Sequence, residues 1–174
     1  LSDGKEIVHI PGDASIKEYA ISDDFEVLYL LKENRYKENP IKDVKPKIHY
    51  DKSHDEYVLF EILVYDTFSK KMKETISLPG FEFVRDLQTC KSGQRCAWLG
   101  IKSGFSEGRV SAYDIKSRIK KSFKTAELLG ISPDGKCIFT KPLKSNGIQR
   151  WNSDSGSLIE SLPETSFVRY NDEL

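Results

Sequence analysis

The residues best suited to chemistry lie in one charged stretch, residues 34–56. It contains His49, Asp51, His54 and Asp55, whose imidazoles and carboxylates are ligand types for zinc or another divalent ion. Their spacing matches no metal-binding motif, and a charged stretch broken by proline is typical of a solvated loop. We therefore interpret residues 34–56 as a polar loop and expect no bound metal or other cofactor. These four residues are the candidate metal ligands if one does bind.

The three cysteines offer a second possible chemistry. Cys90, Cys96 and Cys137 form an odd number without zinc-finger spacing. Cys90 and Cys96 flank the turn KSGQR, where redox pairing or a shared metal can be imagined, but free cysteine is more often a buried packing residue. We expect packing. The cysteine pattern and the lack of an Asn-x-Ser/Thr acceptor favour a cytoplasmic, reducing compartment.

Motifs for catalysis are absent from the sequence. There is no nucleophile elbow, no phosphate-cradling glycine loop and no His-Glu metalloprotease pattern. Outside residues 34–56 the only histidine that could act as a general base is His9. We therefore expect that the chain is not an enzyme.

Charge does not select a nucleic acid or a membrane as partner. The 27 Lys and Arg residues balance 27 Asp and Glu residues, so no overall field attracts a polyanion, and no apolar run approaches the roughly 18 residues needed to span a bilayer. The segment RIKKSFK, residues 118–124, could bind phosphate. We favour an outer edge strand instead, because lysines on an edge discourage pairing with other chains.

Three kinds of mark recur in the same order along the chain. A polar turn separates two apolar runs in ISDDFEVLYL, TCKSGQRCAW and ISPDGKCIFT, which begin at residues 21, 89 and 131. An aromatic residue followed by Asp or Asn precedes a second polar turn, and a proline ends a strand at the close of each unit. The runs between these marks are short, aromatic and β-branched, which predicts an all-β chain. At strand spacing, Tyr29, Trp98, Phe139 and Trp151 are expected in the core.

The spacing of the marks indicates the architecture. With the insertion at 34–56 set aside, they recur every 40 to 45 residues or so, the length of a four-stranded propeller blade. The predicted units span about 13–79, 80–125 and 126–163 of a single domain covering 1–174. Residues 1–12 and 164–174 are expected to belong to neighbouring units.

The repeat resembles that of WD-repeat β-propellers. SPDG followed by CIFT is similar to the first hairpin of that family, and RWN at 150–152, with YD at 65–66 and 113–114, is similar to the Trp-Asp that ends its third strand. The family's Gly-His pair is missing. The resemblance implies about three blades of four antiparallel strands, and a role as an interaction scaffold within a multi-protein assembly.

The number of units raises the question of what covers the outermost blades. Closed propellers have about 4 to 8 blades, so we expect the rest of the same propeller, or a partner chain, to complete the ring. Other protein subunits are the expected partners, and the candidate contact residues are Tyr36, Lys45, Tyr50, Lys120 and Lys121. The alternative is a propeller enzyme or ligand sensor whose channel site includes blades outside this chain.

Overall fold

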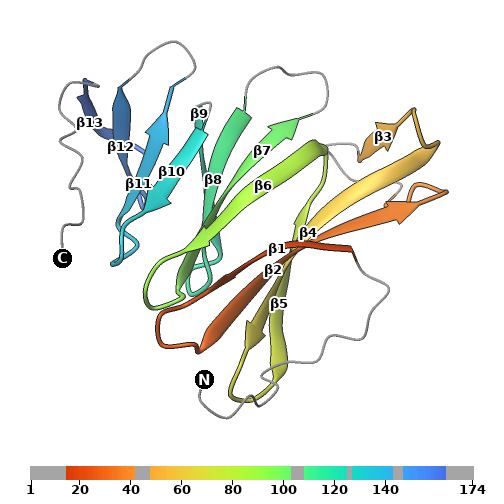
Figure 1. The fold of residues 1–174 in the computed structure, drawn as a ribbon, viewed down its shortest axis with the longest axis horizontal. Coiled ribbons are helices and arrows are strands. Elements are labelled where there is room, and N and C mark those ends of the chain that lie inside the picture. Colours follow the sequence, from red (N-terminus) through yellow and green to blue (C-terminus); the bar gives the residue numbers. More distant parts are fainter. Residues whose placement is uncertain (1–14, 42–47, 103–107, 125–126, 143–146, 164–174) are drawn as a thin grey trace, which may run out of the picture.

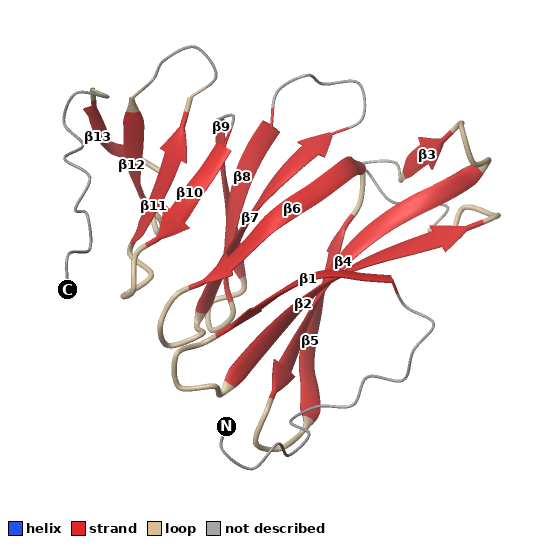
Figure 2. Cartoon of the chain, viewed as in Figure 1, coloured by secondary structure: helices blue, strands red, loops and turns tan. Residues whose placement is uncertain are grey.

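The computed structural model describes residues 15–41, 48–102, 108–124, 127–142 and 147–163. These residues form strands β1 to β13 joined by turns and loops (Figure 2). No helix occurs in these ranges, and therefore none that is long and apolar enough to cross a membrane. The all-β prediction is confirmed.

The strands form three antiparallel sheets, each of which winds back and forth along the chain. Sheet 1 contains β1 (Ser15–Ile21), β2 (Val27–Tyr36), β4 (Glu56–Asp66) and β5 (Lys71–Leu78), with the short β3 (His49–Asp51) beside β4. Sheet 2 contains β6 (Phe81–Thr89), β7 (Arg95–Lys102), β8 (Gly108–Asp114) and β9 (Ile119–Lys124). Sheet 3 contains β10 (Glu127–Ile131), β11 (Cys137–Lys141), β12 (Ile148–Asn152) and β13 (Leu158–Leu162).

The sheets stack face to face like a fan (Figure 1). Their first strands lie together, since β1 contacts β6 and β6 contacts β10. Because side chains alternate along a strand, β7 serves both neighbours of sheet 2: Cys96 and Trp98 belong to the core shared with sheet 1, and Ala97 and Leu99 to the core shared with sheet 3. Sheet 2 is therefore buried on both faces.

The recurring Asp or Asn after an aromatic residue caps a turn. At the hairpin between the last two strands of each sheet, a serine N–H donates to the Oδ1 atom of this residue, which explains why the turn is polar. The residue after that serine has a positive φ in all three sheets. The donor–acceptor pairs are Ser69–Asp66 (2.8 Å), Ser117–Asp114 (2.7 Å) and Ser155–Asn152 (2.9 Å).

The polar turn of each first hairpin is built in a similar way. In sheets 1 and 3 a serine hydroxyl donates to the aspartate two residues later, Ser22 to Asp24 and Ser132 to Asp134. These hydrogen bonds, followed by one from a backbone N–H, lower the pKa of both carboxyl groups. The residue after the aspartate, or after Ser92 in sheet 2, has a positive φ: Phe25, Gly93 and Gly135. The repeated residues therefore shape turns.

The prediction of a loop throughout residues 34–56 is wrong. Residues 34–36 continue β2, residue 56 begins β4, and residues 49–51 form β3. β2 stays in register with β4 as far as Tyr36 opposite Tyr57, and Tyr50 of β3 also pairs with Tyr57. Cross-strand aromatic pairs stabilise a sheet, which explains how a charged, proline-containing segment extends these strands.

Two turn glycines, Gly93 and Gly156, allow the effect of sheet stacking on stability to be measured apart from the effect of backbone conformation. Gly93 has φ +65°, and a Cβ there would lie 2.7 Å from Val27 Cβ in sheet 1. Gly156 has a similar φ of +76°, but its Cβ would meet only Lys121 Cδ at 3.8 Å. We expect Gly156→Ala to cost about 1 kcal/mol, as a positive φ does, and Gly93→Ala about 3 kcal/mol because a clash is added. Urea unfolding of the two variants measures both, and equal losses would contradict this docking of sheet 2 on sheet 1.

Candidate functional site

The seams between the sheets are held by their first turns. The Asp23 N–H of sheet 1 donates to the Lys91 carbonyl of sheet 2 (3.0 Å), and the Lys91 N–H donates to the Pro133 carbonyl of sheet 3 (2.9 Å). A side chain adds to each seam, since the Tyr29 hydroxyl donates to the Gly93 carbonyl at 2.6 Å. Its counterpart at the second seam is Arg95, which donates to the Gly135 carbonyl at 2.7 Å.

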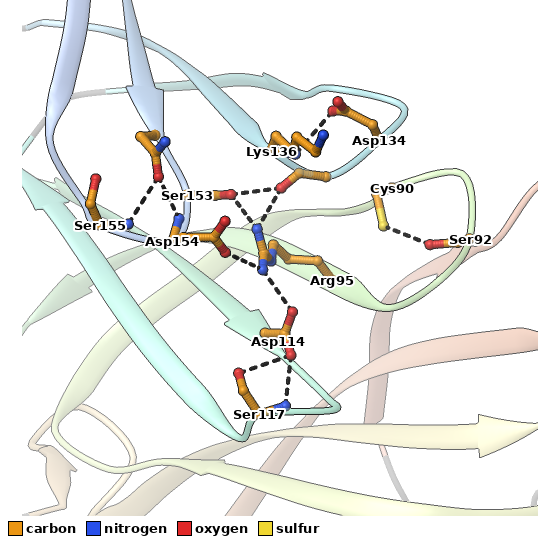
Figure 3. A network of polar contacts seen from close by, with 12 residues as sticks. Cys90, Ser92, Arg95, Asp114, Ser117, Asp134, Lys136, Ser153, Asp154 and Ser155 are labelled. Atoms are coloured by element: carbon orange, nitrogen blue, oxygen red, sulfur yellow. Dashed lines mark hydrogen bonds and ion pairs between the residues drawn. The ribbon is translucent and has the colours of Figure 1, made fainter.

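Arg95 is the centre of a polar network between sheets 2 and 3 (Figure 3). Its Nη1 atom donates to the Gly135 carbonyl and to Ser153 Oγ, and its Nη2 atom lies 2.7 Å from both Asp114 Oδ2 and Asp154 Oδ1. Burial opposes ionisation of Asp114, but hydrogen bonds from Ser117 and Arg95 outweigh it and lower its pKa. The shallow cavity beside this network, about 530 Å³, is thus lined by an arginine whose charge is already neutralised.

Cys90, Cys96 and most of the aromatic residues pack in the core, as predicted, whereas Cys137 is half-buried on the face of sheet 3 that points away from sheet 2. Cys90 and Cys96 are buried and form no disulfide, and burial raises the pKa of the Cys96 thiol. Tyr29 and Trp98 are fully buried between sheets 1 and 2, and Trp151 packs on Phe123 with ring centroids 5.6 Å apart. Phe139 differs, because its place in β11 puts it on the face of sheet 3 that points away from sheet 2.

The part of sheet 1 that departs most from the repeat is its extension, defined as residues 34–41 and 48–59. It comprises the ends of β2 and β4 beyond β1 and β5, together with β3 and its turn (Figure 1). Arg35 holds the strands together: it lies 3.1 Å from Asp51 of β3 and 3.6 Å from Glu56 of β4. The extension is therefore an ordered projection at the end opposite the stacked turns.

Aromatic rings and charges of both signs share the surface of the extension. Tyr50 is 40% exposed, and its ring centroid lies 5.0 Å from that of the half-buried Tyr57. Tyr36 is half-buried and lines a shallow cavity of about 540 Å³ with Lys17, Lys32 and Arg35. Amphipathic rings of this kind, held by surrounding ion pairs, are common anchors at protein–protein interfaces.

A serine, a histidine and an aspartate meet in the β3–β4 turn, but not in a catalytic arrangement. The Asp51 carboxylate accepts hydrogen bonds from Ser53, and His54 Nδ1 lies 2.8 Å from Asp51 Oδ2 and 2.9 Å from Ser53 Oγ. The same ring nitrogen faces both partners, whereas a catalytic triad needs the two nitrogens on opposite partners. The hydrogen bonds from Ser53 and His54 lower the pKa of Asp51, so these residues stabilise a turn.

The four candidate metal ligands are not gathered into one site. Asp51 and His54 are in contact, but Asp55 accepts a hydrogen bond from the Tyr50 hydroxyl. The Nδ1 atom of His49 is buried without a hydrogen-bond partner. Within the described ranges, no group of three His, Cys, Asp or Glu residues is placed to hold a metal ion.

The remaining candidate contact residues lie on a different surface or outside the described ranges. Lys120 is exposed and Lys121 half-buried on β9, which is the last strand of sheet 2 as expected for an edge. Lys45 lies outside the described residues. Thus Tyr36 and Tyr50 share the extension, and the two β9 lysines do not belong to it.

The first strands of the three sheets, β1, β6 and β10, form one edge of the stack, the inner edge. A channel site would lie along this edge. Burial raises the pKa of Asp86 in β6. The positive charge of Arg85 lowers this pKa, and the negative charges of Glu18 in β1 and Glu127 in β10 raise it further. Glu18 already accepts a hydrogen bond from the Leu87 N–H at 2.8 Å. Carboxylates from three sheets therefore approach this edge, and one of them has a structural role.

The sequence did not single out Arg95, although its position carries a signal. Arg95 directly precedes the apolar run of β7 and pairs across the sheet with Asp114 of the repeated YD motif. The matching positions hold Val27 in sheet 1 and Cys137 in sheet 3. A charged residue at an otherwise apolar repeat position was the available clue.

The comparisons with known proteins identify the fold. No family model and no curated protein matches the chain. Among solved structures, the β-propeller domain of the Trilobed protease from Pyrococcus furiosus matches with a TM-score of 0.57 at 9% identity, over 86% of this chain and 42% of that chain. The RRP9 WD40 repeats match with a TM-score of 0.51 at 13% identity, over 88% and 40%. An acylaminoacyl peptidase from Pyrococcus horikoshii matches with a TM-score of 0.50 at 8% identity, over 86% and 25%.

Each sheet is therefore a propeller-type blade, and the predicted fold class is confirmed. The chain spans about two fifths of the length of the first and second of these structures, and a quarter of the third. At such low identity the likeness establishes the fold alone. The matched proteins include both WD40 repeats and peptidases, so the fold does not choose between a scaffold and an enzyme.

The Arg95 network gives a direct test of the seam between sheets 2 and 3. We expect Arg95→Met to lower the free energy of unfolding by about 2 kcal/mol. The reason is that removal of the mostly buried guanidinium deprives Asp114 and the Gly135 carbonyl of their charged hydrogen-bond donor. Lys73→Met is the matched control. Lys73 is 43% exposed and pairs with Asp66 of the same sheet at 3.0 Å, so a loss of about 0.5 kcal/mol or less is expected. If urea unfolding shows the same loss for both, Arg95 does not hold the seam.

Proposed function

We propose that this chain is part of a WD-repeat-like β-propeller that serves as a protein–protein interaction scaffold in a multi-subunit assembly. The extension is its docking element. The observation that carries this proposal is the form of the extension: an ordered, aromatic and charged projection grafted onto a regular stack of sheets. Loops and projections held by a rigid framework are where binding residues concentrate.

The rest of the repeat supports a structural role for the stacked sheets and a docking role for the extension. The repeated turn residues and the polar groups at the seams are engaged in hydrogen bonds that shape turns or join sheets, as with Asp24, Asp66 and Arg95. The extension, in contrast, uses its ion pairs to hold tyrosines at the surface. Tyrosine and arginine supply much of the binding energy at protein interfaces, so another protein is the partner that this chemistry fits.

The share of the matched propeller domain that this chain covers supports a ring with more sheets than these three. Three sheets correspond to 42% of the matched propeller domain, which scales to about seven sheets and falls within the range of roughly 4 to 8 for closed propellers. Sheets outside this chain would then complete the ring. The scaffold is proposed for that whole, with this chain contributing one arc and its docking element.

Removing the tip of the extension, with β3 and its turn, tests the proposal. Tyr36 lies opposite Tyr57, so replacing residues 37–56 by Asn-Gly creates a two-residue hairpin without changing the register. In the intact protein we expect this variant to stay folded. The amount of its specific partner recovered by quantitative co-purification at physiological salt should fall at least ten-fold. The loss is expected because the Tyr50 ring and the surrounding charges leave with the segment.

Phe68→Ser is the matched control, since Phe68 is 74% exposed on the β4–β5 turn, away from the extension. It should retain the partner. Retention of all partners after removal of residues 37–56, or an intact protein that crosslinks to no other chain, would contradict the proposal. A thermal-shift screen with metals and metabolites addresses the channel-site alternative, because a ligand bound near Asp86 would raise the melting temperature.

A further inference from the structure

The extension has two different faces. Val58 of β4 points toward sheet 2, because it belongs to the core that sheets 1 and 2 share, and side chains alternate along a strand. Arg35 is the cross-strand partner of Val58, so it lies on the same side, where it pairs with Asp51 and Glu56. We call this side, which carries Arg35, Asp51 and Glu56, the ionic face.

Three tyrosines form a row across the other face. Tyr57 of β4 lies opposite Tyr36 of β2 on one side and opposite Tyr50 of β3 on the other. Since Tyr57 directly precedes Val58, the three side chains stand next to one another on the face that points away from sheet 2. Tyr36 and Tyr57 are half-buried and Tyr50 is exposed. We call Tyr36, Tyr57 and Tyr50 the tyrosine row.

The tyrosine row lies outside the surface on which another sheet would stack. β1 pairs with β2 only as far as Glu33, and β5 pairs with β4 only as far as Phe60. Tyr36 and Tyr57 are each three residues beyond these positions, which is roughly 10 Å along the strand. The row therefore belongs to the projecting part of sheet 1 and not to its four-stranded part.

The spacing of the row fits a proline-rich segment. Such a segment forms a polyproline II helix, which repeats every three residues over roughly 9.3 Å. Tyr36 and Tyr50 stand two strands apart, which is roughly 9.5 Å, so prolines three residues apart would meet equivalent sides of the row. Surfaces lined by aromatic rings bind polyproline II segments in this way, because the preformed helix loses little entropy on binding.

The hydroxyl groups of the row suit the backbone of such a segment. A polyproline II helix has no internal hydrogen bonds, so its carbonyl groups need outside donors. The Tyr50 hydroxyl donates to Asp55, whereas those of Tyr36 and Tyr57 have no hydrogen-bond partner in the part of the chain that the structure describes. Burial, followed by the charge of Glu61, raises the pKa of Tyr36, so this hydroxyl keeps its proton and can donate.

The cavity beside Tyr36 adds a preference for negative charge. It lies on the β1 side of the row and is lined by Lys17, Lys32 and Arg35 and by the carboxylate of Glu33. Lys17 and Arg35 both pair with Glu33, and Lys32 forms no ion pair with a described residue. Three cations and one carboxylate attract an anionic group. An acidic residue next to the prolines is the complement of this cavity.

A single-stranded nucleic acid fits the row less well. Bases stack on exposed, flat ring faces, but the rings of Tyr50 and Tyr57 lean on each other, with centroids 5.0 Å apart and an angle of 51° between the planes. The carboxylate of Asp55 at the Tyr50 hydroxyl would also repel a phosphate group. A protein segment is therefore the favoured occupant.

We infer that the tyrosine row and the cavity beside it bind an extended, proline-rich segment of a partner protein, with an acidic residue at the Tyr36 end. The inference rests on the proposed role of the extension as a docking element, and it names the chemistry of the partner. The ionic face holds the strands together and takes no part in the contact.

Peptide binding to the intact protein tests the inference. The probes are fluorescein-labelled peptides of about nine prolines, roughly three turns of polyproline II, with a pair of glutamates at either the first or the last position. We expect saturable binding of at least one probe by fluorescence polarisation, and at least ten-fold weaker binding when lysines replace its glutamates. If neither probe binds up to millimolar concentration, the inference is wrong.

Variants on the two faces locate the bound peptide. Tyr57→Thr removes the central ring but keeps a residue that favours strands, and should weaken peptide binding at least ten-fold. Tyr57→Phe keeps the ring and removes only the hydroxyl, so roughly five-fold weaker binding is expected. Lys37→Thr is the control on the ionic face, since Lys37 is 74% exposed and pairs with Glu56, and it should leave binding unchanged. Equal effects of Tyr57→Phe and Lys37→Thr would overturn the assignment to the row.

Competition separates this inference from the proposed function. Release of the co-purified partner by an excess of the probe supports both. If removal of residues 37–56 abolishes co-purification but the probe releases nothing, the docking element stands and the proline-rich partner is wrong. Binding of a single strand of thymidines that is lost in Tyr57→Thr would assign the row to a nucleic acid and would also overturn the inference.

Discussion

Stacking of sheet on sheet in this protein depends on how closely the first turn of each sheet approaches the sheet before it. The Lys91 carbonyl can accept from Asp23 only because Gly93, two residues later, brings no side chain against Val27. The same spacing recurs between Lys91 and Pro133 beside Gly135. Behind these turns the apolar faces of the sheets pack into two cores. Trp98 belongs to one core and Leu99, on the same strand, to the other.

The direction of the seams gives the arc two different ends. In the first turn of sheet 1, Phe25 takes the place of Gly93 and Gly135, and in the first turn of sheet 3, Pro133, which has no N–H, takes the place of Asp23 and Lys91. Neither end repeats the inner seams completely. The chain is thus a stack with a definite polarity, because its two ends present different turn residues.

The repeat made the sheets predictable, and its marks proved to be structural. Asp66, Asp114 and Asn152 cap turns, and a single seam position can hold Val27, Arg95 or Cys137 because only its side-chain direction is conserved between sheets. The extension was predicted as a loop because its charges and prolines dominate its composition. Its strands are specified by pairs such as Tyr36–Tyr57, which a local pattern does not reveal. Arg95 was missed for the same reason: its partners Ser153 and Asp154 lie almost 60 residues away.

The joining of the sheets depends most on the turn-to-turn hydrogen bonds, and amide hydrogen exchange tests these bonds directly. Asp23 and Lys91 lie in exposed turns, so their N–H groups are shielded only by bonding to the next sheet. The amide of Lys136, which bonds to Asp134 within its own turn, is the comparison. We predict that the Asp23 and Lys91 amides exchange as slowly as core strand amides, and far more slowly than the amide of Lys136. Exchange of all three at the same fast rate would show that the sheets are not joined in this way.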